Sequence, residues 1–368
     1  MTMDRMVPAE EGAADVVRRL QILLPGVALV AVLSASSIAV ARSHWLQASG
    51  ISALTLAIVV GMFVGNTVYP RIAALSAEGV AFSRQSLLRL GIILYGFRVT
   101  FQDIGQVGAA GLLIDIVVLS STFALAWFLG TRVCGLDRKT AMLIGAGSSI
   151  CGAAAVMATG PVVGGRAEQV AVAVSTVVVF GTIAIFIYPA AYHLNAQLHL
   201  LPMSLNAYGL FAGSTIHEVA QVVVAGHAIG DASANTAVIE KMARVMLLAP
   251  FLMLLSAYLA RNGGEQPVAK EGLQHSHGKI AVPWFVLLFV AVAGLNSLAK
   301  LPAAVISAAL DLDTAILAMA MTALGLTTHV SAIRSAGVRP LLLGALLAVW
   351  LIVGGLLINF GVARLFAR

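Results

Sequence analysis

Eleven apolar segments, most of them about 20 residues long, follow one another along the chain and restrict its fold more than any other feature. A membrane-spanning helix needs about 20 predominantly apolar residues. Charged residues make up only 10% of the sequence, whereas soluble domains carry about 25%. No segment alternates with period two, as the roughly ten-residue strands of a membrane barrel do. We therefore predict an all-α, polytopic membrane protein with segments at 20–41, 50–69, 85–100, 106–129, 140–160, 167–189, 205–229, 242–260, 281–299, 308–330 and 338–362.

The charges between the segments predict the orientation. With the N-terminus inside, 14 of the 22 Lys and Arg residues lie on the cytoplasmic side, as the positive-inside rule requires. The net charge of +6 then reflects this bias and does not indicate nucleic-acid binding. The first segment follows Arg18 and Arg19, and it is longer than the 7–15 apolar residues of a signal peptide. We therefore expect an uncleaved first span and a cytoplasmic N-terminus.

Two loops fit this topology poorly. Loop 190–204 would be cytoplasmic yet contains no Lys or Arg, and loop 160–168 would be external yet carries Arg166. Both discrepancies disappear if segments 140–160 and 205–229 enter the membrane and return instead of crossing it. The inner charge then rises only from 14 to 15 of 22, so the sequence leaves both full crossing and re-entry open.

These same two segments carry an internal repeat. When residues 146–156 are laid on 212–222, six of the eleven positions are identical and Ser149 faces Thr215. Gly and small hydroxyl residues in mid-segment either allow close helix packing or mark a helix break that exposes backbone groups to a substrate. We favour the break, with backbone N–H groups and hydroxyls that bind an anion. The predicted substrate-binding residues are Gly147, Ser148, Ser149, Gly213, Ser214 and Thr215.

Ionisable residues accompany the second copy of the repeat. Glu218 lies well inside its segment beside His217, with Gln221 on the same helical face as His217. A charged residue at mid-membrane costs about 2.5–3.5 kcal/mol on insertion scales, so such residues are usually functional. We predict that Glu218, His217 and Asp115, which lies in segment 106–129, couple transport to an ion, and that Gln221 binds substrate. A purely structural hydrogen-bonded role is the alternative for each.

A weaker echo relates residues 95–108 to 324–337. In the predicted topology these two segments run in opposite directions, as an inverted repeat requires. Arg98 would attract an anion or extend to the interface, and Thr327, Thr328 and His329 would bind the anion. The two internal similarities have different sequence offsets and do not follow the same order along the chain. Either the repeat is rearranged or one similarity is accidental.

The longest polar stretch divides the chain into a membrane region at 1–260, a cytoplasmic linker at 261–280 and a second membrane region at 281–368. The linker contains His275 and His277, for which solvated residues are a better explanation than a metal site. Two cysteines, Cys134 and Cys151, are too few for a disulfide framework. We predict no cofactor and no bound metal.

Five runs of residues carry a resemblance to a known family, namely 52–58, 88–98, 144–155, 214–222 and 323–329. They resemble the YeiH family of bacterial inner-membrane proteins, which are described as sulfate exporters. The resemblance covers roughly residues 20–362 and implies the cation/proton antiporter and anion transporter superfamily, with its inverted repeats and interrupted helices. It fixes no site residues.

The leading functional prediction is a secondary transporter, an exporter or antiporter, for a small anion coupled to H+ or Na+, with sulfate and sulfite as candidates. ATP-driven pumping is disfavoured because no G-x-x-x-x-G-K-[ST] motif occurs. Two alternatives stay open: an intramembrane protease that pairs Ser148 or Ser149 with His217, and an ion channel. The expected partners are the anion and the lipid bilayer, with a homo-oligomer left open, and the predicted location is the bacterial inner membrane.

Overall fold

All regular structure described in this chain is helical. The computed structural model describes residues 9–43, 52–261, 284–299, 301–328 and 336–366, with side chains from residue 18 onward. The predicted all-α membrane fold is confirmed. Within these ranges six helical stretches are long and apolar enough to span a membrane: Arg18–Ala41, Phe101–Arg132, Ala167–Leu198, Asp231–Arg261, Ala303–Leu326 and Val338–Phe366.

The chain forms two compact units, each built from two parts of the sequence. Unit 1 comprises the described residues of 1–92 and 307–329, and unit 2 those of 93–306 and 330–368. The predicted membrane regions 1–260 and 281–368 each contribute residues to both units. The predicted linker 261–280 lies outside the described residues beyond Arg261.

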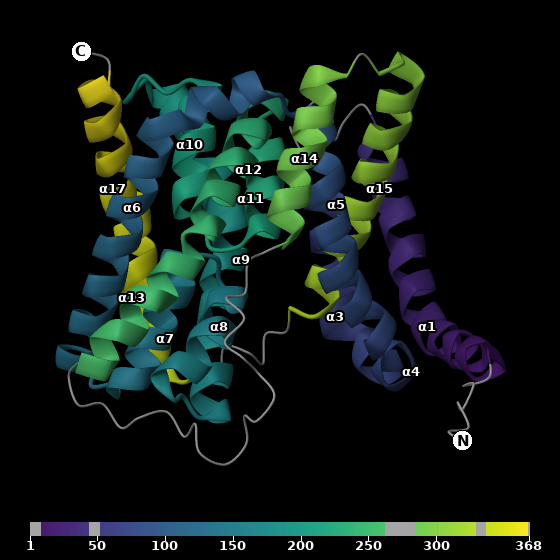
Figure 1. Cartoon of the computed structure of the whole chain (residues 1–368), viewed down its shortest axis with the longest axis horizontal. Helices are drawn as coiled ribbons and strands as arrows, with labels where there is room; N and C mark the ends of the chain where they lie inside the picture. Colours follow the sequence, from purple (N-terminus) through teal and green to yellow (C-terminus); the bar gives the residue numbers. More distant parts are fainter. Residues whose placement is uncertain (1–8, 44–51, 262–283, 300, 329–335, 367–368) are drawn as a thin grey trace, which may run out of the picture. The chain divides into compact units, whose positions relative to one another are not determined.

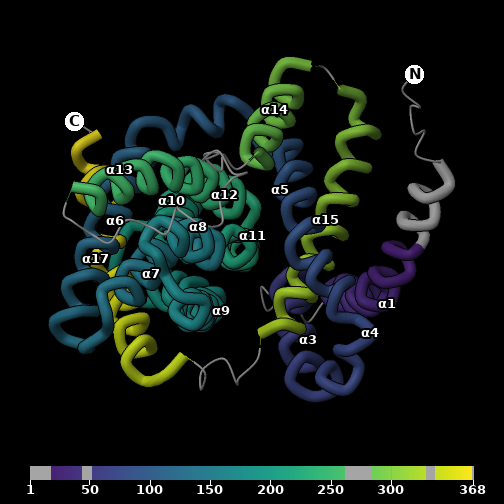
Figure 2. The backbone as a smooth tube through the Cα atoms, turned by 60° about the horizontal axis from the view of Figure 1, so that its bottom comes forward, coloured from purple at the N-terminus to yellow at the C-terminus, as the bar shows by residue number. Residues whose placement is uncertain are grey.

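Unit 1 is built on close contact between neighbouring helices. Helix α1 packs against α3 and α4, which lie side by side with it in Figure 2. Gly26 and Gly79 permit the approach of α1 to α4, because an added Cβ at Gly26 would lie 2.2 Å from the carbonyl oxygen of Ser76. Helix α4 occupies residues that the sequence assigned to a connection. The elements of this unit are α1 (Ala9–Ala41), α3 (Ala53–Thr67), α4 (Tyr69–Phe82), a π-helical turn (Ser83–Leu87), the first part of α5 (Leu88–Tyr95) and most of α15 (Ala303–Leu326).

Unit 2 is organised around long helices. Helices α6 and α9 contain 32 residues each, and α6 is kinked at Gly108, where the backbone is non-helical. The 24 residues of α6 after the kink (109–132) extend about 36 Å and α9 about 48 Å, enough to cross a hydrocarbon core of about 30 Å. Thr100 caps α6 by accepting a hydrogen bond from the Asp103 amide. The helices outside the two interrupted segments are α6 (Phe101–Arg132), α9 (Ala167–Leu198), α12 (Asp231–Met246), α13 (Leu248–Arg261), α14 (Trp284–Leu298) and α17 (Val338–Phe366), preceded by a 3-10 turn (Gly96–Arg98).

Each interrupted segment is a helical hairpin. The first consists of α7 (Arg138–Ser149) and α8 (Ala153–Val163), and the second of α10 (Leu205–Thr215) and α11 (Val219–His227). Half-helices of 9 to 12 residues extend about 14–18 Å, roughly half the hydrocarbon thickness. Neither hairpin is a continuous span.

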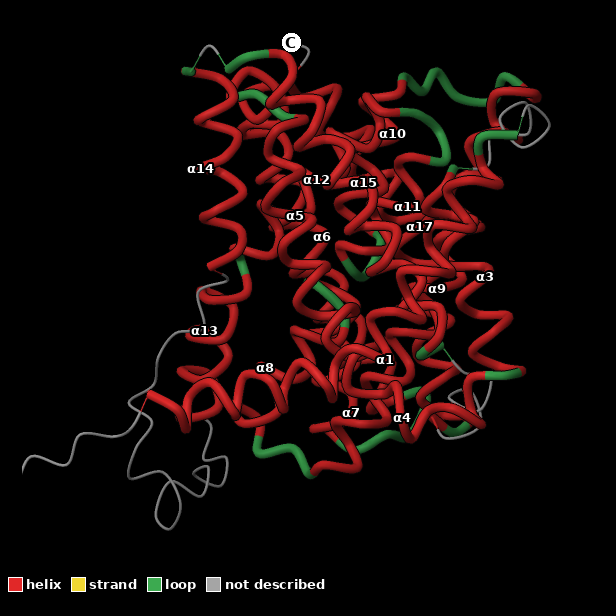
Figure 3. The backbone as a smooth tube through the Cα atoms, turned by 90° about the vertical axis from the view of Figure 1, so that its right-hand side faces the viewer, coloured by secondary structure: helices red, strands yellow, loops and turns green. Residues whose placement is uncertain are grey.

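The outer ends of each hairpin lie together, so both segments are re-entrant. Lys139 at the start of α7 donates a hydrogen bond to the carbonyl of Gly164 just after α8, at 2.9 Å. Tyr208 on α10 donates to the carbonyl of Ala225 on α11, at 3.3 Å. Because the long helix α9 connects the hairpins, they enter unit 2 from opposite ends, as Figures 1 and 3 show. Of the two alternatives left open by the sequence, re-entry is the one observed.

Candidate functional site

The two hairpins break at equivalent residues. Helices α7 and α10 end at Ser149 and Thr215, and helices α8 and α11 begin at Ala153 and Val219. Both pairs differ by 66 positions, which is the offset of the internal repeat (146 to 212). The repeat therefore encodes a shared backbone interruption. In the first hairpin Gly152 makes the turn with a φ of 67°, a value that strongly favours glycine.

Two buried cations hold the carbonyl ends of α7 and α10. Lys241 on α12 donates from Nζ to the carbonyl oxygens of Ile150, at 2.8 Å, and Ile216, at 2.5 Å. These two residues are equivalent in the repeat. Both Lys241 and its neighbour on the same helix, Arg244, are 0% exposed. Arg244 donates to the carbonyl oxygens of Ser149, at 2.7 Å, and Ser214. Positive charge stabilises the C-terminal end of a helix, where carbonyl groups lack intrahelical partners.

A carboxylate lies at the N-terminal ends of the half-helices, where the helix dipole is positive. Glu218, in the second break, accepts a hydrogen bond from the backbone N–H of Ala153 in the first, at 3.2 Å. Its own N–H donates to the side-chain oxygen of Gln221, at 2.9 Å. The N-terminal end of α8 therefore faces a negative charge, which the helix dipole favours. Glu218 is half-buried, whereas its neighbours from 211 to 217 and 219 to 226 are buried.

The glycine and hydroxyl residues predicted to bind substrate lie in the last turns of α7 and α10. At such a C-terminal end the unpaired backbone groups are carbonyls, so the N–H donors of the two breaks belong to Ala153 and Val219 onward. The hydroxyls of Ser149, Ser214 and Thr215 donate to carbonyls of their own helices. Substrate binding stays a prediction for Gly147, Ser148, Ser149, Gly213, Ser214 and Thr215. The backbone N–H donors expected of these residues belong instead to the half-helices that follow them, α8 and α11.

His217 lies at the tip of the second hairpin and is 3% exposed. Its Nδ1 has no hydrogen-bond partner among the described residues. The ring borders a cavity of about 210 Å³ with Phe180 and Tyr188 from α9 and Ile352 from α17. The Ser149 hydroxyl donates to Ala146 at 3.4 Å and does not pair with His217. Across the described ranges no group of three or more His, Cys, Asp or Glu could hold a metal ion.

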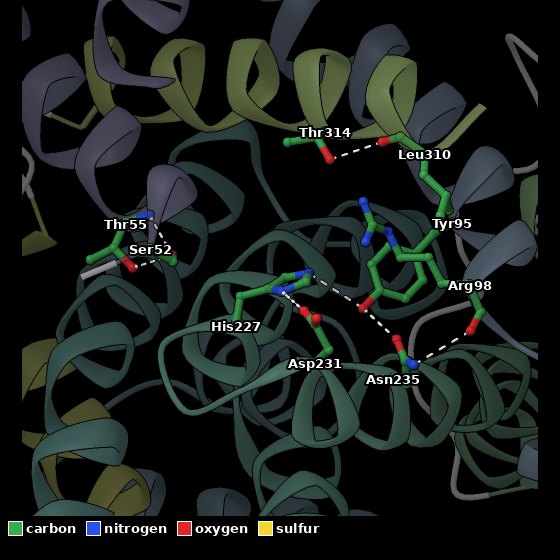
Figure 4. Close-up of polar contacts among 9 residues, drawn as sticks. All are labelled: Ser52, Thr55, Tyr95, Arg98, His227, Asp231, Asn235, Leu310 and Thr314. Atoms are coloured by element: carbon green, nitrogen blue, oxygen red, sulfur yellow. Dashed lines mark hydrogen bonds and ion pairs between the residues drawn. The ribbon is translucent and has the colours of Figure 1, made fainter. Parts of the chain in front are cut away.

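Arg98 belongs to a polar network at the junction of α11 and α12 in unit 2 (Figure 4). Its guanidinium lies over the Tyr95 ring, 5.4 Å from the centroid. The Tyr95 hydroxyl donates to Asn235, at 3.0 Å, and approaches His227, at 3.4 Å. His227 in turn contacts the exposed carboxylate of Asp231, at 3.2 Å. Arg98 therefore lies against an aromatic ring and not at the hairpin tips.

The remaining predicted residues fall elsewhere. Thr327 and Thr328 belong to unit 1, where their hydroxyls donate to the carbonyls of Ala323 and Leu324. Arg84 donates to the Thr327 hydroxyl at 3.3 Å. His329 lies outside the described residues. Asp115 on α6 is 0% exposed and interacts with Glu240, Lys241 and Arg244 of α12.

The sequence has close relatives over nearly its whole length. A family described as conserved hypothetical protein 698 matches residues 25–344. A UPF0324 membrane protein of Pseudomonas aeruginosa is 61% identical over 350 residues, which are 95% of this chain and 97% of the relative. The chain belongs to the UPF0324 family. The UPF0324 inner membrane protein YeiH of Escherichia coli is 53% identical over 350 residues, again 95% and 97% of the two chains. No solved structure matches.

These relatives confirm the resemblance to the YeiH family and place the protein, with its several membrane-spanning helices, in the bacterial inner membrane as a multi-pass protein. The names of the UPF0324 relatives state a membrane location and no substrate.

Three central residues of this UPF0324 protein escaped the sequence analysis. Glu240 and Lys241 directly precede the predicted segment 242–260 and Arg244 lies near its start, and none of the three is among the predicted site residues. They lie instead within α12, fully buried. The signal that could have found them is their spacing: three charges within five residues, continuing the helical period directly into an apolar run.

Proposed function

We propose that this UPF0324 protein is a secondary transporter of a small anion, coupled to H+ or Na+. The observation that carries the proposal is the meeting of two broken helices, which enter from opposite ends and are joined by the Glu218–Ala153 hydrogen bond. Paired interruptions that line a site near the bilayer midplane are the usual construction of secondary transporters. Irregular backbone at that depth is tolerated only where it is buried or lines a cavity.

The N-terminal ends of α8 and α11 are the best position for an anion. Their first N–H groups have no partners within their own helices, and the dipoles of both half-helices favour negative charge. Gln221 lies beside them, fully buried, and its side-chain Nε2 has no hydrogen-bond partner among the described residues. Sulfate and sulfite are the first anions to test, because the resemblance to the YeiH family implies a sulfate exporter.

Glu218 suggests how an ion would be coupled to anion movement. Its carboxylate occupies the Ala153 N–H that an anion would use, so the charged side chain and the anion compete for one place. Proton uptake by Glu218 would remove the competing charge and release that N–H. Lys241 and the Cys151 thiol also interact electrostatically with Glu218. Anion affinity should therefore rise as pH falls.

Flux measurements in liposomes that contain the full chain test this proposal. Labelled sulfate and labelled sulfite are followed separately, with an imposed pH gradient in either direction. We expect at least one anion to move several-fold faster from the acidic side in the wild type, and this response to be lost in Glu218→Gln. Glu168→Gln, which changes an exposed acid at the start of α9, is the matched control and should behave as wild type.

Each result has a distinct meaning. If neither anion moves in protein that is folded by circular dichroism, the sulfur oxoanion assignment is wrong. If an anion moves and Glu218→Gln keeps the full pH response, transport stands but Glu218 does not couple it.

A further inference from the structure

Two acids lie buried behind the hairpin tips without any donor to satisfy them. Asp115 on α6 and Glu240 on α12 are both 0% exposed, and their carboxyl groups interact with each other. None of their four oxygens has a hydrogen-bond partner among the described residues. Two ionised carboxylates that share a buried site repel each other, and one then retains its proton.

The neighbouring cations do not pair directly with these acids. Lys241 donates from Nζ, and Arg244 from Nε and Nη1, to backbone carbonyls of the two breaks. Arg244 Nη2 has no hydrogen-bond partner among the described residues, and within the described ranges neither cation forms an ion pair with Asp115 or Glu240. Tyr188 from α9, Cys151 from the first break and His217 from the second also interact electrostatically with Arg244. The charges of both cations therefore act on the acid pair through space, without a hydrogen bond to it.

The charges balance when the carboxyl pair keeps one proton. Each helix C-terminus carries about half a negative charge, so the ends of α7 and α10 together offset one of the two cations. The second cation offsets one negative charge on the acid pair. A pair with both acids ionised would leave a buried excess of one negative charge, which is costly to desolvate.

A polar cavity lies one helical turn along α12 from Glu240. It has a volume of about 400 Å³ and lies among α6, α10 and α12, with Asp103, Val107 and Thr236 in its lining. Thr236 precedes Glu240 by one helical turn, and Val107 lies just before the non-helical residue Gly108 of α6. On the same helix as Asp115, an added Cβ at Gly111 would be 2.3 Å from Glu240 Oε2. The absence of a side chain at Gly111 therefore leaves room for the Glu240 carboxyl.

We infer that Asp115 and Glu240 share one exchangeable proton, and that this proton reaches water through the cavity bordered by Val107 and Thr236. The pair is thereby a second proton-binding site, separate from Glu218 at the hairpin tips. Its use in transport rests on the proposed function, whereas the bound proton itself does not.

Infrared spectroscopy of the purified full chain detects the proton without any transport assay. At neutral pH the wild type should show the C=O stretch of a protonated carboxyl, shifted in D2O. Both Asp115→Asn and Glu240→Gln should abolish this band, because either change removes the negative neighbour that keeps the remaining acid protonated. Glu168→Gln should retain it. A wild type without the band overturns the inference whether or not the variants fold, and a band that survives both single variants overturns sharing.

The route is tested by the rate of the deuterium shift. In Thr236→Cys, modification with a water-soluble thiol reagent should slow the shift several-fold relative to the same variant unmodified, since both native cysteines are buried. An unchanged rate after complete modification would exclude the cavity as the path.

Discussion

The Glu218 carboxylate accepts a hydrogen bond from the backbone N–H of Ala153, 3.2 Å away, and so joins the tips of two hairpins that enter unit 2 from opposite ends. On the other side of the breaks, Lys241 binds one carbonyl from each tip. The acidic Glu218 therefore faces the N-terminal side of the breaks, and the basic Lys241 faces the C-terminal ends of the broken helices. This arrangement supports the proposal that the hairpin tips are the functional centre, and it predicts which changes will damage them.

Replacement of Lys241 should destabilise the protein strongly. In Lys241→Met the carbonyls of Ile150 and Ile216 lose their charged donor inside the unit, and each such hydrogen bond contributes about 1.5–3 kcal/mol. We expect a loss of about 3 kcal/mol or more, measured by thermal unfolding in detergent. Lys139→Met is the matched control, because Lys139 also binds a hairpin carbonyl but on the exposed surface, where a substitution changes stability by about 0.5 kcal/mol. Equal losses in the two variants would disprove the central role of Lys241.

Gly152→Ala should disturb both the backbone and the Glu218 contact. A side chain at this φ costs about 1–3 kcal/mol, and the new Cβ would lie 2.3 Å from Glu218 Cγ. The variant should therefore lose stability and lose the pH response of anion flux together. Gly105→Ala, in an open helical position of α6 with no atom within 4 Å of the added Cβ, should gain up to about 1 kcal/mol. A neutral Gly152→Ala would contradict the positive-φ turn.

Asp137, at the outer end of the first hairpin, should make the stability of the protein fall at acid pH. Burial raises the pKa of the Asp137 carboxyl, but hydrogen bonds from Thr140 and Gln169 outweigh burial and hold it below its ordinary value. A lowered folded-state pKa stabilises the protein above the unfolded pKa, about 3.9, and this contribution is lost as pH falls through the folded value. Asp137→Asn should cost about 1 kcal/mol near neutral pH, as expected for a helix cap.

The test compares melting temperatures of the wild type and Asp137→Asn from pH 7 to the lowest pH at which both stay folded. The difference in melting temperature should narrow below about pH 4, near the pKa of an aspartate in the unfolded chain. A gap that stays constant across this range would show that the charge of Asp137 contributes nothing.

The sequence predicts much of this fold because bilayer burial acts on each segment separately. Apolar length alone identifies the long helices, and the repeat identifies the two interrupted segments. The breaks themselves follow the predicted residues, because α7 and α10 continue to Ser149 and Thr215 and the next half-helices begin at Ala153 and Val219. The charges of loops 160–168 and 190–204 also indicate re-entry of segments 140–160 and 205–229, and both segments are re-entrant in the structure.

The remaining features of the fold and site depend on contacts between distant residues, which the amino-acid composition does not predict. Helix α4 was read as a connection because its sequence is only moderately apolar, yet Gly79 allows it to pack against α1. Lys241 and Arg244 look like interfacial charges until the carbonyl ends of two distant hairpins are brought beside them. Asp115 is recognisable as a buried acid, but its partner Glu240 is 125 positions away (115 to 240) and no local pattern connects them.

The most direct test of the central claim is counterflow of labelled sulfate or sulfite in proteoliposomes. Vesicles loaded with the unlabelled anion are diluted into a trace of the labelled one, without any pH gradient. A transporter that alternates access at the hairpin tips should accumulate label inside transiently above the outside concentration, and the overshoot should be reduced in Gly152→Ala. Label that equilibrates without an overshoot would contradict alternating access and indicate a channel.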